Sequence, residues 1–384
     1  MNGTRDYHQD AFVSFRPNST DDGMVKGKVL LAYIIEPFLL KKGEKIPNSH
    51  THYHESVLMA QVFLEMGYAV DAISYHNTTF QPKKDYDLFI SARTNFEKIS
   101  KRLNDNCIKI AHLDMAHWLF NNKSAYDRCI AIQNRKGVTL PLKTKLQEFN
   151  WAIELADYAT ILGNRFTLET YKYANKQIFR LSIPTCATYS WFSGKDFKKA
   201  KKNFLWFGSS GFVHKGLDVT LDAFAGMPEH HLYVCGPIEK EKEFVQAYYK
   251  ELYETPNIHT VGWVDVEDST FEELRNTCVG LIYPSASEGQ AGSVVTCMQA
   301  GLIPIVSYES GVDIDTNFGL LLPDSTIEEI RKGIIHLSNM PEDQLIAMAK
   351  KAWEEARSRY TKEVYAREFK AIIQEILELE KGKK

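Results

Sequence analysis

Residues 279–307 read VGLIYPSASEGQAGSVVTCMQAGLIPIVS, and this stretch decides the fold. Its first five residues form a short apolar run that a proline ends, which is typical of a buried strand. A loop with Glu288 and two glycines follows, and Ser293 is a good N-cap for a helix near 292–300. A second apolar run at 303–307 predicts the next strand. Strand, loop, helix and strand in this order form a βαβ unit of a parallel sheet.

The same alternation of short β-branched runs and amphipathic stretches extends in both directions. In the C-terminal half the predicted strands are 204–208, 231–235, 258–261, 279–283, 303–307 and 319–322, with helices near 217–226, 239–254, 270–277, 292–300 and 326–338. In the N-terminal half the predicted strands are 28–35, 69–75, 86–91, 107–112, 158–162 and 178–183, with helices at 52–66, 95–103, 141–156 and 166–174. Residues 1–25 fit a tail or an irregular cap, and residues 341–379 predict long surface helices.

A polar break at 184–203 separates the two series of strands and helices. It begins with Pro184 and carries five lysines, so we interpret it as a linker. We predict an α/β fold of two Rossmann-like, doubly wound domains, residues 1–190 and 200–360, that face each other across a cleft. Ligands of such sheets bind beyond the carboxyl ends of the strands, so the chemistry should lie in strand-to-helix turns.

The composition narrows the class of protein. The 384 residues carry 46 Lys and Arg against 49 Asp and Glu, and 44% of them are hydrophobic. This argues against a disordered chain and gives no global reason to expect a nucleic-acid partner. No apolar run approaches the roughly 18 to 20 residues of a membrane span, and the N-terminus lacks the apolar stretch of a signal peptide. We therefore expect a cytoplasmic protein.

The turn after the strand at 204–208 is the first candidate site. It is rich in small residues, namely Gly208, Ser209, Ser210 and Gly211. Small residues let a ligand approach the backbone closely. Lys215 follows just before a helix, whose N-terminal amides and positive dipole end favour an anion. The segment fits a diphosphate, and a plain loop with a solvated lysine is the alternative.

The loop inside the opening stretch is the second candidate site. Glu288 lies among backbone amides that Gly289 and Gly292 leave accessible, with Gln290 and Ala291 between them. A carboxylate suits the hydroxyls of a sugar, and amides at a helix N-terminus suit a phosphate. The alternative is that Glu288 only complements the positive end of the helix dipole.

Residues 288–307 resemble the motif of retaining GT-B glycosyltransferases of family four, in which a Glu-Gly loop enters a small-residue helix and an Ala-Gly-x-x-Pro-x-Val strand follows. Further segments occur in the family's order: the lysine turn at 208–216, LYVCGP at 232–237, VGWV at 261–264 and FGLLLP at 318–323. The resemblance covers about residues 204–323 well and residues 28–183 in architecture only. It implies the GT-B fold, with the last helix, 361–384, packing back on the N-terminal domain.

The resemblance implies an enzyme that moves a hexose from a nucleotide diphosphate sugar to a hydroxyl of a glycan or glycolipid acceptor, with retention and without a cofactor or metal. It assigns Lys215 to the donor diphosphate, Glu288 to the hydroxyls of the donor sugar, and residues 289–292 to backbone contacts around both. The donor site that we predict comprises Gly208, Ser209, Ser210, Lys215, Gly236, Glu288, Gly289, Gln290, Ala291, Gly292, Ser293 and Thr296.

Two positions depart from the family's pattern. The family has a second glutamate eight residues after the first, where it holds the nucleotide ribose, and this chain has Thr296 there. A hydroxyl makes a hydrogen bond but does not accept two as a carboxylate does. The family also has an arginine at the start of the lysine turn, where this chain has Ser209 or Ser210. The change removes a bidentate phosphate clamp.

Histidines supply the remaining candidates. The resemblance places a histidine that faces the donor sugar at the end of an N-domain strand, and His112 fits this place best, with His117 next. We therefore expect His112, Glu288 and Lys215 to be the catalytic residues, His112 by orienting the sugar or stabilising charge. A structural histidine that bonds the loop backbone is the alternative.

His50, His52 and His54 alternate along the segment PNSHTHYHESVLMA. A spacing of two does not put them on one helical face, and a metal site needs more partners. We interpret residues 48–54 as a loop and the first turn of a helix, with His52, His54 and also His117 on the acceptor side. A solvated helix start is the alternative.

The charge is divided unevenly along the chain. Residues 1–200 carry 27 Lys and Arg against 20 Asp and Glu, a charge of +7, and residues 201–384 carry 19 against 29, a charge of −10. A basic N-terminal half suits an anionic acceptor or peripheral contact with the inner face of a membrane. Solvated lysines without a partner are the alternative.

Two other functions stay open at this stage. One is a GT-B phosphorylase that uses inorganic phosphate, which needs further cations around the phosphate site. The other is a non-catalytic protein that binds a carbohydrate or nucleotide in a degraded site, for which Thr296 and the absent arginine are the motivation.

Overall fold

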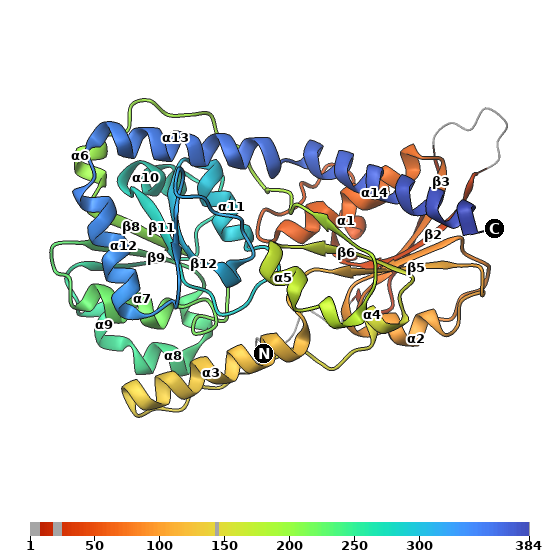
Figure 1. Cartoon of the computed structure of the whole chain (residues 1–384), viewed down its shortest axis with the longest axis horizontal. Helices are drawn as coiled ribbons and strands as arrows, with labels where there is room; N and C mark the ends of the chain where they lie inside the picture. The colour runs from red at the N-terminus through yellow and green to blue at the C-terminus, as the bar shows by residue number, and fades with distance from the viewer. Residues whose placement is uncertain (1–7, 18–24, 143–145, 384) are drawn as a thin grey trace.

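The computed structural model describes residues 8–17, 25–142 and 146–383. The chain forms two α/β lobes that lie side by side (Figure 1). The N-terminal lobe is built on a seven-stranded sheet and the C-terminal lobe on a six-stranded one. The α/β class predicted from the alternating pattern is therefore confirmed.

The N-terminal sheet is parallel apart from one edge. In spatial order its strands are β1 (Phe12–Phe15), β3 (Tyr68–Ser74), β2 (Gly27–Tyr33), β4 (Leu88–Ser91), β5 (Ile108–Leu113), β6 (Tyr158–Leu162) and β7 (Ile178–Leu181). Only β1 runs antiparallel to its neighbour. The helices are α1 (Thr51–Glu65), α2 (Phe96–Ser100), α3 (Trp118–Lys136), α4 (Ala152–Leu155) and α5 (Arg165–Glu169), with 3-10 turns η2 (Glu36–Leu39), η3 (Arg93–Asn95) and η4 (Lys172–Ala174).

Two sequence predictions for this lobe are wrong. The predicted tail 1–25 contains β1, which pairs with β3, while residues 1–7 and 18–24 lie outside the described residues. The helix predicted at 141–156 is reduced to the single turn α4, and the long helix α3 lies before it. Only three residues of α3 are buried, so its sequence lacks the apolar periodicity that marks an ordinary packed helix.

The C-terminal sheet is fully parallel. In spatial order its strands are β10 (Ile258–Gly262), β9 (His231–Cys235), β8 (Asn203–Phe207), β11 (Gly280–Tyr283), β12 (Ile303–Ser307) and β13 (Leu320–Leu322). The helices are α6 (Phe197–Ala200), α7 (Leu217–Ala225), α8 (Lys242–Ala247), α9 (Tyr249–Tyr253), α10 (Ser269–Thr277), α11 (Gly292–Gln299) and α12 (Ile327–Asn339), with 3-10 turns η5 (Ile238–Lys240) and η6 (Tyr308–Ser310). The strand order reverses between β8 and β11, so the turns after these two strands meet at a switch point.

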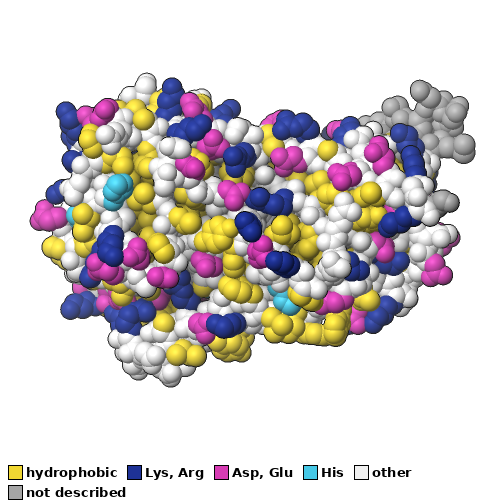
Figure 2. Space-filling model, in the orientation of Figure 1, with side chains coloured by type: hydrophobic (Ala, Val, Ile, Leu, Met, Phe, Trp, Pro, Cys, Tyr) yellow, Lys and Arg dark blue, Asp and Glu magenta, His cyan; other side chains and the backbone are white. Residues whose placement is uncertain are grey.

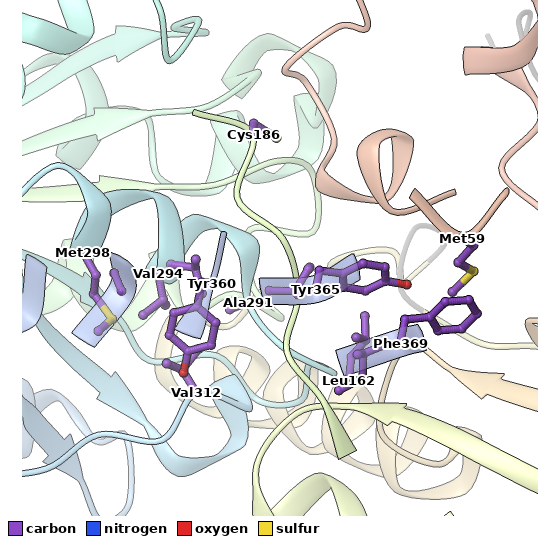
Figure 3. Packing of buried hydrophobic residues seen from close by; sticks show 14 of the residues in the cluster. Met59, Leu162, Cys186, Ala291, Val294, Met298, Val312, Tyr360, Tyr365 and Phe369 are labelled. Carbon is purple, nitrogen blue, oxygen red and sulfur yellow. The ribbon is translucent and has the colours of Figure 1, made fainter. Parts of the chain in front are cut away.

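Two C-terminal helices join the lobes on one side. Helix α13 (Glu342–Arg359) packs on α11, and α14 (Lys362–Lys383) crosses back to pack on α1 (Figure 1). In α14 the ring of Phe369 lies 5.5 Å from that of Phe63. Figure 3 shows Met298 and Val312 of the C-terminal lobe and Met59 of the N-terminal lobe in one hydrophobic cluster with residues of this helical segment. The apolar core is therefore continuous across both lobes.

Helix α3 joins the lobes on the opposite side, where it runs beneath the C-terminal lobe in Figure 1. The Arg135 guanidinium at its last turn lies 2.7 Å from carboxylate oxygens of both Asp218 and Asp222 in α7. The ammonium of Lys136 is 2.5 Å from the Glu251 carboxylate. Ile132 packs in the hydrophobic cluster of the C-terminal lobe. Cations at the carboxyl end of α3 also suit its dipole.

The pair between Arg135 and Asp218 should contribute strongly to stability. The Asp218 side chain is fully buried, and burial raises its pKa although Arg128 and Arg135 oppose that rise. In Arg135→Met this carboxyl loses its nearest cation, so the free energy of unfolding should fall by about 2–3 kcal/mol in urea denaturation at pH 7. Lys123→Met, which breaks an exposed pair with Asp127, should cost no more than about 0.5 kcal/mol. Equal effects of the two variants would show that the buried pair adds nothing.

Candidate active site between the two lobes

Lys215 and Glu288 meet where the turns after β8 and β11 converge. The Lys215 ammonium lies 2.7 Å from Oε1 of Glu288 and 2.8 Å from the Tyr283 hydroxyl. That hydroxyl in turn donates to Glu288 Oε1 at 3.1 Å. Gly216 allows this geometry because its φ is +72° and a Cβ there would overlap the carbonyl of Pro284. The two residues that the sequence assigned to the donor are therefore brought into direct contact.

The pair is held in a buried, charged state. Only 7% of the Lys215 side chain and 17% of the Glu288 side chain are exposed. Burial disfavours the ammonium, but the Glu288 carboxylate and the Tyr283 hydroxyl outweigh it, so the pKa of Lys215 rises above its ordinary value. Burial and the Glu288 charge raise the pKa of Tyr283. A lysine that stays charged in a buried site is suited to an anionic ligand.

The turn after β8 forms a tight backbone cradle. A Cβ on Gly236 would lie 2.5 Å from the carbonyl oxygen of Gly208, so these two predicted donor residues lie side by side. Ser209 is exposed and Ser210 is half-buried. The amide of Gly211 donates to the carboxylate of Glu241, which lies just before α8. Sequence reasoning missed this carboxylate, because no local pattern links it to the turn.

The loop at 288–292 packs its backbone against the N-terminal lobe. A Cβ on Gly289 would overlap the carbonyl oxygen of Asp114, so only glycine fits this approach. The amide of Ala116 donates to the Glu288 carbonyl at 3.3 Å, and Thr167 Oγ1 donates to the Gly289 carbonyl at 3.2 Å. The side-chain oxygen of Gln290 accepts a 2.6 Å hydrogen bond from the Ile183 amide. The two lobes are thus closed onto each other at this loop.

The N-cap of helix α11 lies two residues earlier than the sequence predicted. Ala291 is its N-cap and makes no side-chain cap hydrogen bond, so Ser293 lies inside the first turn rather than at the cap. A Cβ on Gly292 would lie 2.9 Å from Cγ2 of Thr51, the first residue of α1. The N-terminal ends of α1 and α11 therefore face each other. Thr296 is buried one turn into α11.

His112 is buried in a network at the carboxyl edge of the N-terminal sheet. Its Nδ1 lies 2.8 Å from Oγ1 of Thr160, and its Nε2 lies 3.0 Å from Oε1 of Glu55. The other Glu55 oxygen lies 2.6 Å from Nδ1 of His52 and accepts a 3.0 Å hydrogen bond from the Tyr33 hydroxyl. The structure thus brings His112 and His52 together through a carboxylate that sequence reasoning had not selected.

A second buried ion pair lies beside this network. The Arg93 guanidinium donates two hydrogen bonds to Asp114, at 3.0 and 2.6 Å. Burial opposes ionisation, but the Arg93 charge holds the pKa of Asp114 below its usual range, and the charges of His52 and His112 act in the same direction. Arg93 adopts a φ of +65°, which is uncommon for a residue with a side chain.

The side chains of the two remaining predicted histidines have partners other than Lys215 and Glu288. His117 is the N-cap of α3, and its Nε2 lies 3.0 Å from the Tyr173 hydroxyl. His54 packs toward α14, with its Nε2 3.3 Å from Asn48 Oδ1. Burial and the nearby Lys362 charge lower the pKa of His54 to about 4. Within the described part of the chain, no group of three His, Cys, Asp or Glu side chains is placed to hold a metal ion.

Arg128 of α3 reaches the C-terminal lobe close to the lysine turn. Its guanidinium donates a 2.6 Å hydrogen bond to the carbonyl of Pro284, the residue after β11. Burial lowers the pKa of Arg128, while the charges of Asp218 and Glu309 raise it. Sequence reasoning missed Arg128, Arg93 and Glu55 because each acts on residues far away in the sequence. The i,i+3 spacing of His52 and Glu55 was the one local signal.

Comparisons with known proteins agree with the architecture. Residues 201–340 match the family model described as Glycosyl transferases group 1. The resemblance that residues 204–323 carry is therefore confirmed for the C-terminal lobe. No curated protein matches the chain.

Solved structures are similar over most of the chain. Sucrose-phosphate synthase from Thermosynechococcus elongatus gives a TM-score of 0.64 at 12% identity, covering 92% of this chain and 99% of that one. Anabaena HepE in complex with UDP-glucose gives 0.59 at 12% identity, covering 91% and 100%. S. aureus TarM in complex with fondaparinux, alpha-GlcNAc-glycerol and UDP gives 0.53 at 14% identity, covering 73% of this chain but 54% of that one, so the chain spans about half of TarM's length. These likenesses show that the fold is GT-B.

The glycine at 289 should control how closely the lobes approach. In Gly289→Ala the new Cβ meets the Asp114 carbonyl and the Cα of Met115, neither of which is a flexible side-chain end. We expect a larger radius of gyration in small-angle X-ray scattering and a loss of about 1–3 kcal/mol in the free energy of unfolding. Gly382→Ala, which has open space around its Cβ, should change neither. An unchanged radius for Gly289→Ala would contradict the closed packing.

Proposed function

We propose that this chain transfers a hexose from a nucleotide diphosphate sugar to a hydroxyl of a glycan or glycolipid, with retention at the anomeric carbon. The observation that carries the proposal is the buried contact between Lys215 and Glu288 at the switch point of the C-terminal sheet. Both residues lie inside the segment that matches the glycosyltransferase family model. HepE, which has the same fold, is described in complex with UDP-glucose.

The geometry fits a donor that carries a diphosphate next to a sugar. Lys215 supplies a fixed positive charge, and the start of α11 supplies backbone amides without a side-chain cap. The Glu288 carboxylate is suited to accept hydrogen bonds from sugar hydroxyls once the donor displaces it from Lys215. Residues 208–210, Gly236, residues 289–293 and Thr296 would surround the donor, and no cofactor or metal is needed in this proposal.

Such a transfer requires that the negative charge on the departing diphosphate be stabilised. A charged amine and oriented amides stabilise that charge without rearranging during the reaction. The leaving phosphate then takes the proton of the acceptor hydroxyl on the same face. His112 is 2% exposed, so the residues that cover it would have to move before it could contact the sugar. Its role toward the donor stays a prediction.

A non-catalytic binding protein is the second candidate. The closed packing of the loop at 288–292 favours this candidate, because Ala116 and Thr167 donate hydrogen bonds to the backbone carbonyls of Glu288 and Gly289. Such a protein would bind the nucleotide sugar and show no turnover. We rank it below the transferase because the charged pair of Lys215 and Glu288 is intact. The phosphorylase ranks lower still, because Lys215 is the only cation that we assign to inorganic phosphate, and this reaction needs further cations.

Peripheral contact with a membrane would suit a glycolipid acceptor. Leu119, Tyr126 and Ile130 are exposed on α3 at a spacing of seven and four, so they share one face. Phe149 and Trp151, also exposed, stack edge to face 5.1 Å apart. Figure 2 shows hydrophobic side chains gathered along the lower edge of the molecule. None of the helices described has the length and hydropathy of a membrane span.

Both members of the charged pair should be required for turnover. A thermal-shift screen with UDP-, GDP- and ADP-sugars identifies the donor, and release of the nucleotide with glycan and glycolipid acceptors measures turnover. Lys215→Ala and Glu288→Ala should each lower the rate at least about tenfold, or roughly 1.4 kcal/mol. Lys350→Ala and Glu378→Ala, which change exposed residues of α13 and α14, serve as matched controls.

The outcomes separate the candidates. Normal turnover in both site variants would show that the site assignment is wrong. Stabilisation by a nucleotide sugar without turnover on any acceptor would favour the binding protein. Proton NMR of the product reports the anomeric configuration, and an inverted product would reject retention.

Exposed apolar residues of α3 should support binding to lipid. The triple variant Leu119→Ser, Tyr126→Ser and Ile130→Ser should reduce co-sedimentation with anionic vesicles at least about fivefold, because burial of apolar area drives such binding. The control triple variant, at exposed positions of α12, α13 and α14, changes Ile335, Ile346 and Leu379 to serine. Equal vesicle binding by both triple variants would reject this surface.

A further inference from the structure

Glu55 is a fully buried carboxylate that the proposed transfer does not use. Two imidazoles, His52 and His112, and the Tyr33 hydroxyl lie within 2.6–3.0 Å of its oxygens. Burial disfavours the charged form, but the charges and hydrogen bonds of the two histidines hold the pKa of Glu55 well below its usual range. The carboxylate is therefore an anion that fixes two imidazoles from inside the N-terminal lobe.

His52 is the partner of this buried anion whose side chain retains the most exposure. Its Nδ1 lies against Glu55, so its Nε2, on the opposite side of the ring, faces away from the buried carboxylate. The His52 side chain is 12% exposed, whereas those of Glu55 and His112 are at most 1% exposed. Its ring also packs 4.7 Å from that of His50 and 5.7 Å from that of Tyr33. These contacts hold the imidazole in one orientation.

His52 follows the residue of α1 that faces the start of α11. Its neighbour Thr51 is the residue that a Cβ on Gly292 would meet. The His52 charge also acts on Asp114, whose backbone packs against Gly289. Neither α1 nor α11 has an acidic residue in its first turn. Two positive helix ends and an imidazole thus surround the place where the proposed donor carries its phosphates.

We propose that His52, held by the Glu55 carboxylate, is a contact of the donor diphosphate, supplied by the N-terminal lobe when the lobes close. Glu55 is the positioning residue that fixes this imidazole. The proposal rests on the proposed function and adds to it, because the serine at 209 or 210 leaves the lysine turn without a guanidinium. It also moves His52 from the acceptor side, where the sequence predicted it, to the donor.

Several charged groups act on the His52 imidazole. From α1 it faces Glu55, from the loop after β5 Asp114, from β2 the Tyr33 ring, and from the preceding loop His50, while His112 of β5 lies against the other oxygen of Glu55. Arg93 neutralises Asp114, and the Tyr365 hydroxyl of α14, with a pKa that burial and the Glu55 charge raise, lies against Glu55. The carboxylates that act on the imidazole are therefore already paired with other groups of the chain.

Binding of a nucleotide sugar to the unaltered protein and to variants tests the proposal. By isothermal titration calorimetry, His52→Gln should bind UDP-glucose about five- to tenfold more weakly than the unaltered protein, because the diphosphate loses a hydrogen-bond contact. If GDP-mannose or ADP-glucose gives the larger shift in the thermal screen, that compound is the probe.

Variants separate His52 from its surroundings. Glu55→Gln should weaken binding of UDP-glucose to a similar extent as His52→Gln, because the ring loses its fixed orientation. Glu55→Asp, which keeps the charge, should restore part of the affinity. His336→Gln, an exposed histidine of α12, is the matched control and should keep all of it. If Glu55→Gln does not fold, as shown by its thermal melt, His52→Gln carries the test.

The outcomes distinguish this inference from the proposed function. Uridine, or the nucleoside that matches the probe, lacks phosphates and should bind equally well to all variants. Binding of the nucleotide sugar that needs Lys215 but is unchanged in His52→Gln would overturn the inference and leave the proposed function intact. Weaker binding in His52→Gln but not in Glu55→Gln would overturn the positioning role. No binding of any nucleotide sugar would overturn both.

Discussion

A backbone contact between the two lobes determines the geometry of everything around it. Gly289 lets the loop after β11 lie directly against the residues that follow β5, and Gly311 gives the same loop room from its other side, where a Cβ would overlap the Gly289 carbonyl. Because these contacts involve main-chain atoms, they fix the position of the loop more firmly than side chains would. Lys215 contacts Glu288 at the start of this loop. Helix α11 begins at the end of the loop and faces α1. The N-terminal lobe therefore helps to fix the backbone of the loop that carries Glu288.

The opposite charges of the two halves have a structural explanation. The basic residues of the N-terminal lobe that pair with acids of the C-terminal lobe include Arg135 with Asp218 and Arg180 with Asp313, the latter 2.6 Å apart. Part of the +7 on residues 1–200 thus compensates part of the −10 on residues 201–384. Charge complementarity of this kind favours one mutual orientation of two surfaces.

The sequence was sufficient for elements whose pattern is local and insufficient for those defined by distant contacts. The run at 279–307 predicted β11, α11 and β12, because buried parallel strands and a glycine-rich turn leave a clear trace in adjacent residues. Lys215 and Glu288 were found for the same reason. Helix α3 was missed because it packs on the other lobe, and β1 because a four-residue edge strand carries little periodicity. The role of Glu55 can be recognised only in the folded chain, where β2, β5 and α1 bring Tyr33 and the two histidines around it.

The carboxylate of Glu241 gives the site a further property. It already accepts the Gly211 amide in the turn where the donor's phosphates would lie, and it also lies 3.4 Å from the Phe212 amide. Glu288 pairs with Lys215 in the same way. The groups that would attract an anion are thus paired with acidic side chains of the chain itself, so they need no mobile counterion. A small inorganic anion has to compete with two tethered carboxylates, whereas a larger ligand gains additional contacts as it displaces them. Such an arrangement would favour a large anionic ligand over a small one.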